Sequence, residues 1–220
     1  MPAAQPNLRP GEVVIKDING YKRDANNQPI VDENGRFILT GEPDGIIDDA
    51  DNVLIGSQDP GWLAGLINTF RYKDFDLSVQ FNGMFDRKMQ DPTQMAYGLG
   101  GGDLARFGYN ALRLIQKRWT WDNPSTEYPC SFNGWNTNYT SGDWYYQNAW
   151  FIRLSNITLG WSLPKTWLER TKVISKVRIS FSANNLFCIT PYKGLDPETD
   201  YYTAAYPNAR TYSLGINVTF

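Results

Sequence analysis

The chain has 220 residues, a formal net charge of -2 and no histidine. This length suits one large β domain or two ordinary ones, and a charge near zero provides no basic surface for nucleic acid, so we exclude that class of partner. Histidine is the commonest general base and metal ligand, so its absence disfavours catalytic triads and zinc sites. Aromatic residues make up 15% of the chain, a share typical of surfaces that hold sugars or lie at a membrane interface.

The sequence contains no run of about eighteen apolar residues, so we expect no membrane-spanning helix. Residues 1–10 form an N-terminal flank that lacks the basic start and apolar core of a signal peptide. Cys130 and Cys188 match no metal or redox spacing, so we expect two free thiols rather than a disulfide.

An acidic, turn-rich loop covers residues 17–56, after a short strand predicted at 11–16. Within this loop, residues 32–35 have the composition of a hairpin turn. Once the hairpin is set aside, four side chains follow the order of an EF-hand-type calcium loop: Asp17, Asn19, Asp44 and Asp51.

A hard cation needs several converging carboxylate and amide oxygens, and Gly45 permits the sharp turn between them. These four residues are therefore the candidate ligands of a Ca²⁺ site. The alternative interpretation is an acidic surface turn, because an insertion splits the loop and its last ligand is Asp rather than the longer Glu.

Five segments alternate apolar and polar residues, as strands with one apolar and one polar face do. They are residues 62–71, 75–85, 151–161, 176–187 and 211–220, of which the first alternates only in part. A change of parity at Ser155 and Asn156 indicates a β-bulge. Lys176 and Arg178 lie on the polar face of their strand, which suits a wet lumen better than a packed core.

Short connectors join these strands at 72–74 and at 163–175, where residues 163–170 have helical character, whereas the other connectors are long. Outer-membrane barrels have short periplasmic turns and long extracellular loops, so the last strand is expected to end in the periplasm. We predict an all-β chain whose antiparallel strands form the C-terminal section of a transmembrane β-barrel. Five strands cannot close a barrel, so we expect an incomplete barrel that belongs to a longer protein.

Residues 86–149 are predicted to form a long extracellular loop with one short helix at 103–117. Several aromatic residues of this loop are suited to stack on sugar rings: Trp119, Trp121, Trp135 and Trp144. The alternative is that they pack the loop against itself.

Several segments along residues 11–220 share an order and spacing that is more specific than any one of them. They are 16–20 with 44–51, 55–56 with 60, 72–78, 118–119 with 123–124, 151–164, 184–187, 192–198 and 214–220. Together they resemble the C-terminal end of SusC/RagA-type TonB-dependent outer-membrane transporters. The resemblance implies a parent protein of about 22 strands with an N-terminal plug domain, which is absent from this chain.

The resemblance further implies uptake of oligosaccharides or peptides across the outer membrane of a Gram-negative cell. The implied partners are a SusD-like surface lipoprotein and the TonB complex, which would act through the missing N-terminal part. Phe220 resembles the terminal aromatic signal that directs barrel assembly. No cofactor is required, apart from the candidate Ca²⁺.

Two other functions remain as alternatives. One is a soluble, calcium-stabilised β-sandwich that binds carbohydrate. The other is a glycoside hydrolase that uses a carboxylate pair such as Asp196 and Glu198. No acid/base partner can be argued for that pair, so we predict that the chain is not an enzyme.

Overall fold

The computed structural model describes residues 5–98, 108, 110–125, 127–130, 143–199 and 206–220. The chain divides into two compact units. The first unit comprises Met1–Ile55 and Thr93–Tyr145, and the second comprises Gly56–Pro92 and Tyr146–Phe220. Among the described residues, no helix is both long enough and apolar enough to cross a membrane.

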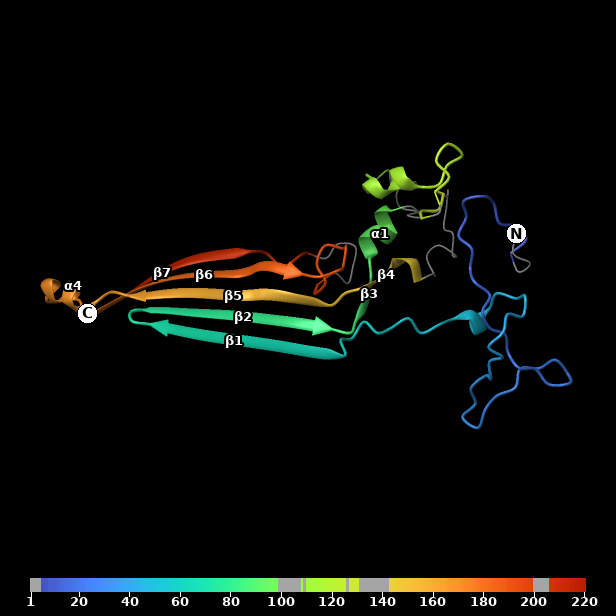
Figure 1. Ribbon diagram of the computed structural model, residues 1–220, viewed down its shortest axis with the longest axis horizontal. Coiled ribbons are helices and arrows are strands. Elements are labelled where there is room, and N and C mark those ends of the chain that lie inside the picture. The colour runs from blue at the N-terminus through green and yellow to red at the C-terminus, as the bar shows by residue number, and fades with distance from the viewer. Residues whose placement is uncertain (1–4, 99–107, 109, 126, 131–142, 200–205) are drawn as a thin grey trace. The chain divides into compact units, whose positions relative to one another are not determined.

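Five antiparallel strands form one sheet in the second unit, in the order β1-β2-β5-β6-β7 (Figure 1). They are β1 (Trp62–Tyr72), β2 (Phe75–Phe85), β5 (Phe151–Ser162), β6 (Lys176–Ile189) and β7 (Thr211–Thr219). All five predicted strands are confirmed. Within the described residues β1 and β7 are the two edges of the sheet, so the predicted incomplete barrel is confirmed too.

The predicted turn between β1 and β2 is tight, with Lys73 in the left-handed region at φ 52°. The connector from β5 to β6 contains α4 (Lys165–Leu168) and η4 (Glu169–Thr171), which confirms its predicted helical character.

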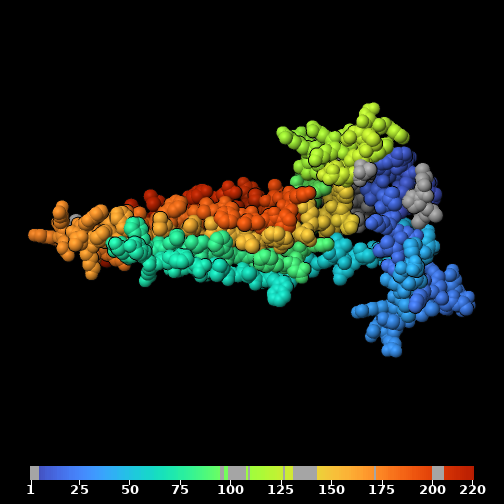
Figure 2. Space-filling view, viewed as in Figure 1, coloured from blue at the N-terminus to red at the C-terminus, as the bar shows by residue number. Residues whose placement is uncertain are grey.

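The sheet has one apolar and one polar face, because its strands pair in a register that matches their alternation. Apolar partners face each other along the sheet, as in Phe181 opposite Leu214 and Ile179 opposite Ile216. In the space-filling view the side chains form a continuous layer from β1 in teal to β7 in red (Figure 2). Leu63 and Ile67 of β1 lie opposite Met84 and Gln80 on the polar face, which explains why the sequence of this strand alternates only in part.

The predicted β-bulge is confirmed. The register shifts between Leu154 and Asn156 against both neighbouring strands, and on β6 Asn185 has a φ of 54° at the same level. One extra residue reverses which face the following side chains occupy. As a result, Arg153 lies on the polar face, opposite Asn82 of β2 and Cys188 of β6.

Part of the stretch that was predicted as a long loop forms a second, small sheet. β3 (Lys88–Gln90) pairs with β4 (Tyr146–Asn148), and α1 (Pro92–Tyr97) follows β3. Met89, Ala149 and Tyr192 form a buried apolar cluster in this part of the second unit.

The first unit has little regular structure, with the 3-10 helices η1 (Asp49–Asp51), η2 (Arg113–Lys117) and η3 (Asp143–Tyr145). Its core surrounds the fully buried Tyr145, and the side chains packed on it are Val13, Leu114, Ile115, Tyr128 and Trp144. Of the predicted helix at 103–117, residues 103–107 and 109 lie outside the described residues, and η2 covers its C-terminal end.

The short strand predicted at 11–16 is wrong, because a side chain takes the place of a partner strand. The amide of Gln5 donates to the carbonyl of Ile15 at 2.6 Å and accepts from its N–H at 3.2 Å. The backbone of Ile15 is thereby satisfied without a ladder.

The predicted hairpin turn is confirmed, and it is one of three similar units of eight residues that cover positions 21–44. The amide of Asp32 donates to the carbonyl of Arg36 at 2.8 Å, and Gly35 has a φ of 76°. Lys22, Ile30 and Ile38 hold equivalent places, and their backbones bond in a ring: Ile30 to Lys22, Ile38 to Ile30 and Lys22 to Ile38.

Candidate functional site

The polar face of the five-stranded sheet carries an ion pair that crosses three strands. The guanidinium of Arg178 on β6 reaches a carboxylate oxygen of Asp76 on β2 at 2.6 Å. Gly160 on β5 lies between them, and a Cβ atom there would be 2.5 Å from Arg178 Nη2 and 2.6 Å from Asp76 Oδ1. The glycine therefore lets the pair bridge directly across the middle strand.

A row of amide and hydroxyl groups continues the polar face across β5, β6 and β7. Thr158 donates to Asn156 at 3.0 Å, the amide of Asn156 donates to Asn184 at 2.8 Å, and Asn184 donates to Thr211 at 2.9 Å. Such satisfied polar side chains are typical of a wall that faces water.

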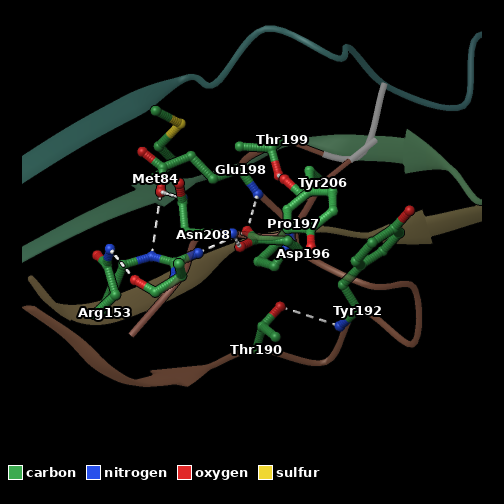
Figure 3. Close-up of polar contacts among 12 residues, drawn as sticks. Met84, Arg153, Thr190, Tyr192, Asp196, Pro197, Glu198, Thr199, Tyr206 and Asn208 are labelled. Atoms are coloured by element: carbon green, nitrogen blue, oxygen red, sulfur yellow. Dashed lines mark hydrogen bonds and ion pairs between the residues drawn. The ribbon is translucent and has the colours of Figure 1, made fainter. Parts of the chain in front are cut away.

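A buried charged cluster lies at the end of this face where β5 begins (Figure 3). Arg153 and Asp196 are each only 4% exposed. The guanidinium of Arg153 lies 2.6 Å from Asp196 Oδ1 and 3.2 Å from Glu198 Oε2. Asn208 completes the cluster, since its backbone N–H donates to Asp196 at 3.0 Å and its side-chain amide donates to Glu198 at 3.0 Å.

The cluster fixes residues 191–199, the segment that follows β6, which we call the β6 loop segment. Other contacts hold the same segment. The guanidinium of Arg87 donates to the carbonyl of Pro197 at 3.0 Å, and the hydroxyl of Tyr192 donates to the carbonyl of Gln90 at 3.2 Å. The backbone N–H of Lys193 donates to the side chain of Gln147 at 3.0 Å.

The carboxylate pair considered for a glycoside hydrolase thus has another role. Asp196 and Glu198 are counter-ions of one arginine. The sequence identified neither Arg153 nor its role, because its partners lie more than forty positions away. The only local signal is the parity change next to Arg153, which moves a cation onto the polar face.

The four candidate Ca²⁺ ligands are held by backbone contacts. The carboxylate of Asp17 accepts from the N–H groups of Asp44 at 3.2 Å and Gly45 at 2.8 Å. The carboxylate of Asp51 accepts from Ile18 at 2.7 Å and Asn19 at 3.3 Å. Within the described residues, no three or more acidic, cysteine or histidine side chains form a group that could hold a metal ion. The donors are thus not gathered for a cation, and calcium binding stays a prediction.

The candidate sugar-stacking residues divide into packed and exposed ones. Trp144 packs beside Tyr145 and meets Tyr128 edge-on at 5.7 Å. The ring of Trp119 lies against Gly11 and meets Trp121 edge-on at 5.0 Å. Trp121 itself is 80% exposed, and Trp135 lies outside the described residues. Packing of the loop against itself thus accounts for Trp119 and Trp144, and sugar binding stays a prediction.

Cys130 and Cys188 are free thiols, as predicted. Burial, together with the nearby charge of Glu12, raises the pKa of Cys130. The side chain of Phe220 is 80% exposed.

Similar proteins share both the sequence and the fold of this chain. No protein-family model matches it. It is 30% identical over 200 residues to the TonB-dependent receptor SusC of Bacteroides thetaiotaomicron, a match that covers 88% of this chain and 19% of the relative. It is 28% identical over 203 residues to the TonB-dependent receptor P3 of Formosa agariphila, which covers 86% of this chain and 19% of that relative.

Among solved structures, the RagAB peptide transporter is similar with a TM-score of 0.64 and 27% identity, over 86% of this chain and 20% of that one. The RagAB peptide importer in a closed state gives a TM-score of 0.67 at 24% identity, over 92% of this chain and 22% of that one, which supports the fold alone. The chain spans about one fifth of the length of the relatives it matches.

These relatives are TonB-dependent receptors and transporters, not enzymes, which confirms the non-enzymatic prediction. SusC-like TonB-dependent receptors are outer-membrane proteins, and the sheet with its apolar and polar faces fits that location. The family resemblance, the fold and the outer-membrane location are therefore confirmed: the chain is a SusC/RagA-like segment of a TonB-dependent receptor.

Proposed function

We propose that this chain forms part of the wall of an outer-membrane importer. Its five strands place an apolar face toward lipid and a polar face toward the passage. The observation that carries this proposal is the exposure of the apolar face, where Leu214 is 73% exposed and Ile216 is 63% exposed. A face of this kind costs free energy in water and is stabilised in hydrocarbon.

Oligosaccharides or peptides are the proposed cargo, with a SusD-like surface lipoprotein as partner and TonB as the source of energy. Support comes from the similarity to SusC and to the RagAB peptide transporter. The polar face adds the chemistry that such cargo requires, because hydroxyl and amide groups hydrogen-bond both sugars and peptide backbones.

The alternative of a soluble β-sandwich requires the Val177, Ile179 and Phe181 face to be buried against a second sheet. Phe181 is instead 43% exposed, and its neighbour Leu214 on β7 is more exposed still. The exposure of this face favours the membrane wall.

Uptake measurements test the transport proposal. A strain that lacks the complete reading frame encoding this chain, and the same strain with that frame restored, are supplied with fluorescent oligosaccharides and fluorescent peptides. We expect uptake of one cargo class in the restored strain, its loss when TonB is inactivated, and its reduction when a neighbouring SusD-like gene is deleted. Equal uptake with and without the reading frame contradicts the proposal.

Phe220 is proposed to be the assembly signal, on the basis of its aromatic ring and the alternation of the strand before it. Deletion of Phe220 should lower the amount of receptor assembled in the outer membrane, whereas Thr219→Ser should not. Unchanged assembly of the deletion variant would count against this role.

A further inference from the structure

The β6 loop segment, residues 191–199, folds onto the polar face of the sheet rather than away from it. The register decides this point. Arg153 lies opposite Asn82 and Cys188, on the same face as the Asp76 and Arg178 ion pair. Because Asp196 and Glu198 both contact Arg153, the segment that carries them covers the polar face at the start of β5.

The contact between this segment and the wall is charged and buried. The side chains of Arg153 and Asp196 are each 5% exposed. A buried cation without its counter-ion is strongly unfavourable. If the segment left the wall, Arg153 would either become exposed to water or remain buried without a counter-ion. The ring of Phe151 lies 5.5 Å from the same guanidinium and is fully buried.

We propose that the β6 loop segment is an inward-folded constriction of the passage, and that Arg153 is the positioning residue that holds it there. This inference rests on the proposed function, in which the polar face lines the passage. Arg153 acts through Asp196 and Glu198, and the segment they carry would narrow the space available to cargo at this end of the wall.

A native thiol reports the position of the segment. Cys188 is the strand partner of Arg153, and the charges of Arg153, Asp196 and Glu198 all act on it. In a Cys130→Ser background, Cys188 is the one remaining cysteine of this chain. The labelling rate of Cys188 by a hydrophilic maleimide then measures how well the segment covers the wall.

The experiment uses the complete receptor in isolated outer membranes and compares three variants. We expect Arg153→Met to raise the Cys188 labelling rate by about tenfold, because the buried carboxylates lose their counter-ion. Arg153→Lys, which keeps the charge, should restore most of the protection. Arg178→Met, which removes another cation of the polar face at a distance from the segment, should leave the rate unchanged.

Charge alone cannot produce the expected increase. A nearby cation favours the reactive thiolate, so its removal would slow labelling if the segment stayed in place. If Arg153→Met does not assemble, Arg153→Gln decides the question, because glutamine removes the same cation but keeps a hydrogen-bond donor for the buried carboxylates. An unchanged or slower labelling rate in the assembled variant overturns the proposal.

A second readout concerns the width of the passage. Because a plug domain is expected to fill the lumen of the complete receptor, the readout compares a small and a bulky hydrophilic maleimide, which need not cross the barrel. Assembled Arg153→Met should raise the labelling rate of Cys188 by the bulky reagent at least fourfold more than by the small one, whereas Arg178→Met should change neither rate. Faster labelling by both reagents alike overturns the constriction while leaving the segment on the wall. Failure of cargo uptake in the unmodified receptor would contradict the transport function alone, since neither readout uses the cargo.

Discussion

Gly160 is the residue on which the cross-strand ion pair of the polar face depends. Its neighbours Asp76 and Arg178 come from strands on either side of β5, so the shortest path between them passes over residue 160. The atoms that crowd this position are the ends of two flexible side chains. An added methyl group would therefore part the ion pair rather than move the backbone.

Gly160→Ala should lower the free energy of unfolding by about 1 kcal/mol, the upper range for an ion pair that is partly exposed to water. The measurement is a denaturant titration of the protein folded in detergent micelles or lipid vesicles. In an Arg178→Met background the same substitution should cost almost nothing, because the pair is already lost.

Gly65→Ala is the matched control. Gly65 also lies on the polar face, opposite Asn82, but no atom lies within 4 Å of an added Cβ there. An equal loss of stability in the two alanine variants would show that crowding at Gly160 is not the cause.

Asp51 gives the first unit a dependence on pH. Burial by itself raises the pKa of Asp51, but hydrogen bonds from the N–H groups of Ile18, Asp48 and Asn19 outweigh it and lower the pKa below its ordinary value of 3.8. A carboxyl whose pKa is lowered by folding stabilises the folded state above its ordinary pKa, and this contribution is lost as pH falls through the lowered value.

We therefore expect the amides of Ile18 and Asn19 to lose protection from hydrogen exchange as pH falls below about 4, after correction for the intrinsic exchange rate. Asp51→Asn should show weak protection at every pH. Asp49→Asn, in the same 3-10 helix, should keep the wild-type profile, and loss of the profile in this control would assign the effect to another group.

At the scale of elements, the acidic loop has two interpretations. It is either a metal site or a loop closed by hydrogen bonds between its carboxylates and its own backbone. Asp17 and Asp51 already accept several N–H groups, and these bonds close the loop without a cation. Calorimetric titration with Ca²⁺ tests the remaining prediction. Heat that disappears in Asp44→Asn would support a calcium site, whereas the absence of both heat and thermal shift would remove it.

The strands could be predicted from sequence because each is long and has faces in two different environments. Alternation is complete in β7 and unbroken from Lys176 to Asn184 in β6, and the bulge at Ser155 appears in the sequence as a change of parity. β3 and β4 could not be predicted in this way, since three residues are too few for a period to be seen.

The charged cluster could not be predicted from the sequence, for a different reason. Arg153 meets Asp196 through a fold that brings together residues 43 positions apart, and no local pattern records such a contact. The eight-residue units at 21–44 were accessible in principle, because Asp24 and Asp32 hold equivalent turn positions and bond the backbone two and four residues ahead. Only the second of these turns has the Asp-to-Gly composition of a familiar hairpin turn.

At the scale of the whole molecule, the second unit is organised by the solvent on each side of its sheet. Apolar side chains on β1 and β7 remain exposed although both strands are fully formed. In water this surface would be an aggregation liability. In a bilayer the same surface is covered by lipid chains. The backbone N–H and C=O groups at the two sheet edges then require partner strands for their hydrogen bonds.

Paired substitutions on β7 test which side faces lipid. Leu214→Arg places a charge on the apolar face near the middle of the strand, and we expect it to lower the free energy of folding into vesicles by about 2–4 kcal/mol. Ser213→Arg places the same charge one residue away on the polar face, where the cost should be below about 1 kcal/mol. Folding of the complete receptor into vesicles, titrated with denaturant, measures both values. Since adjacent residues of one strand share depth and differ only in face, equal costs would mean that the two faces meet the same solvent.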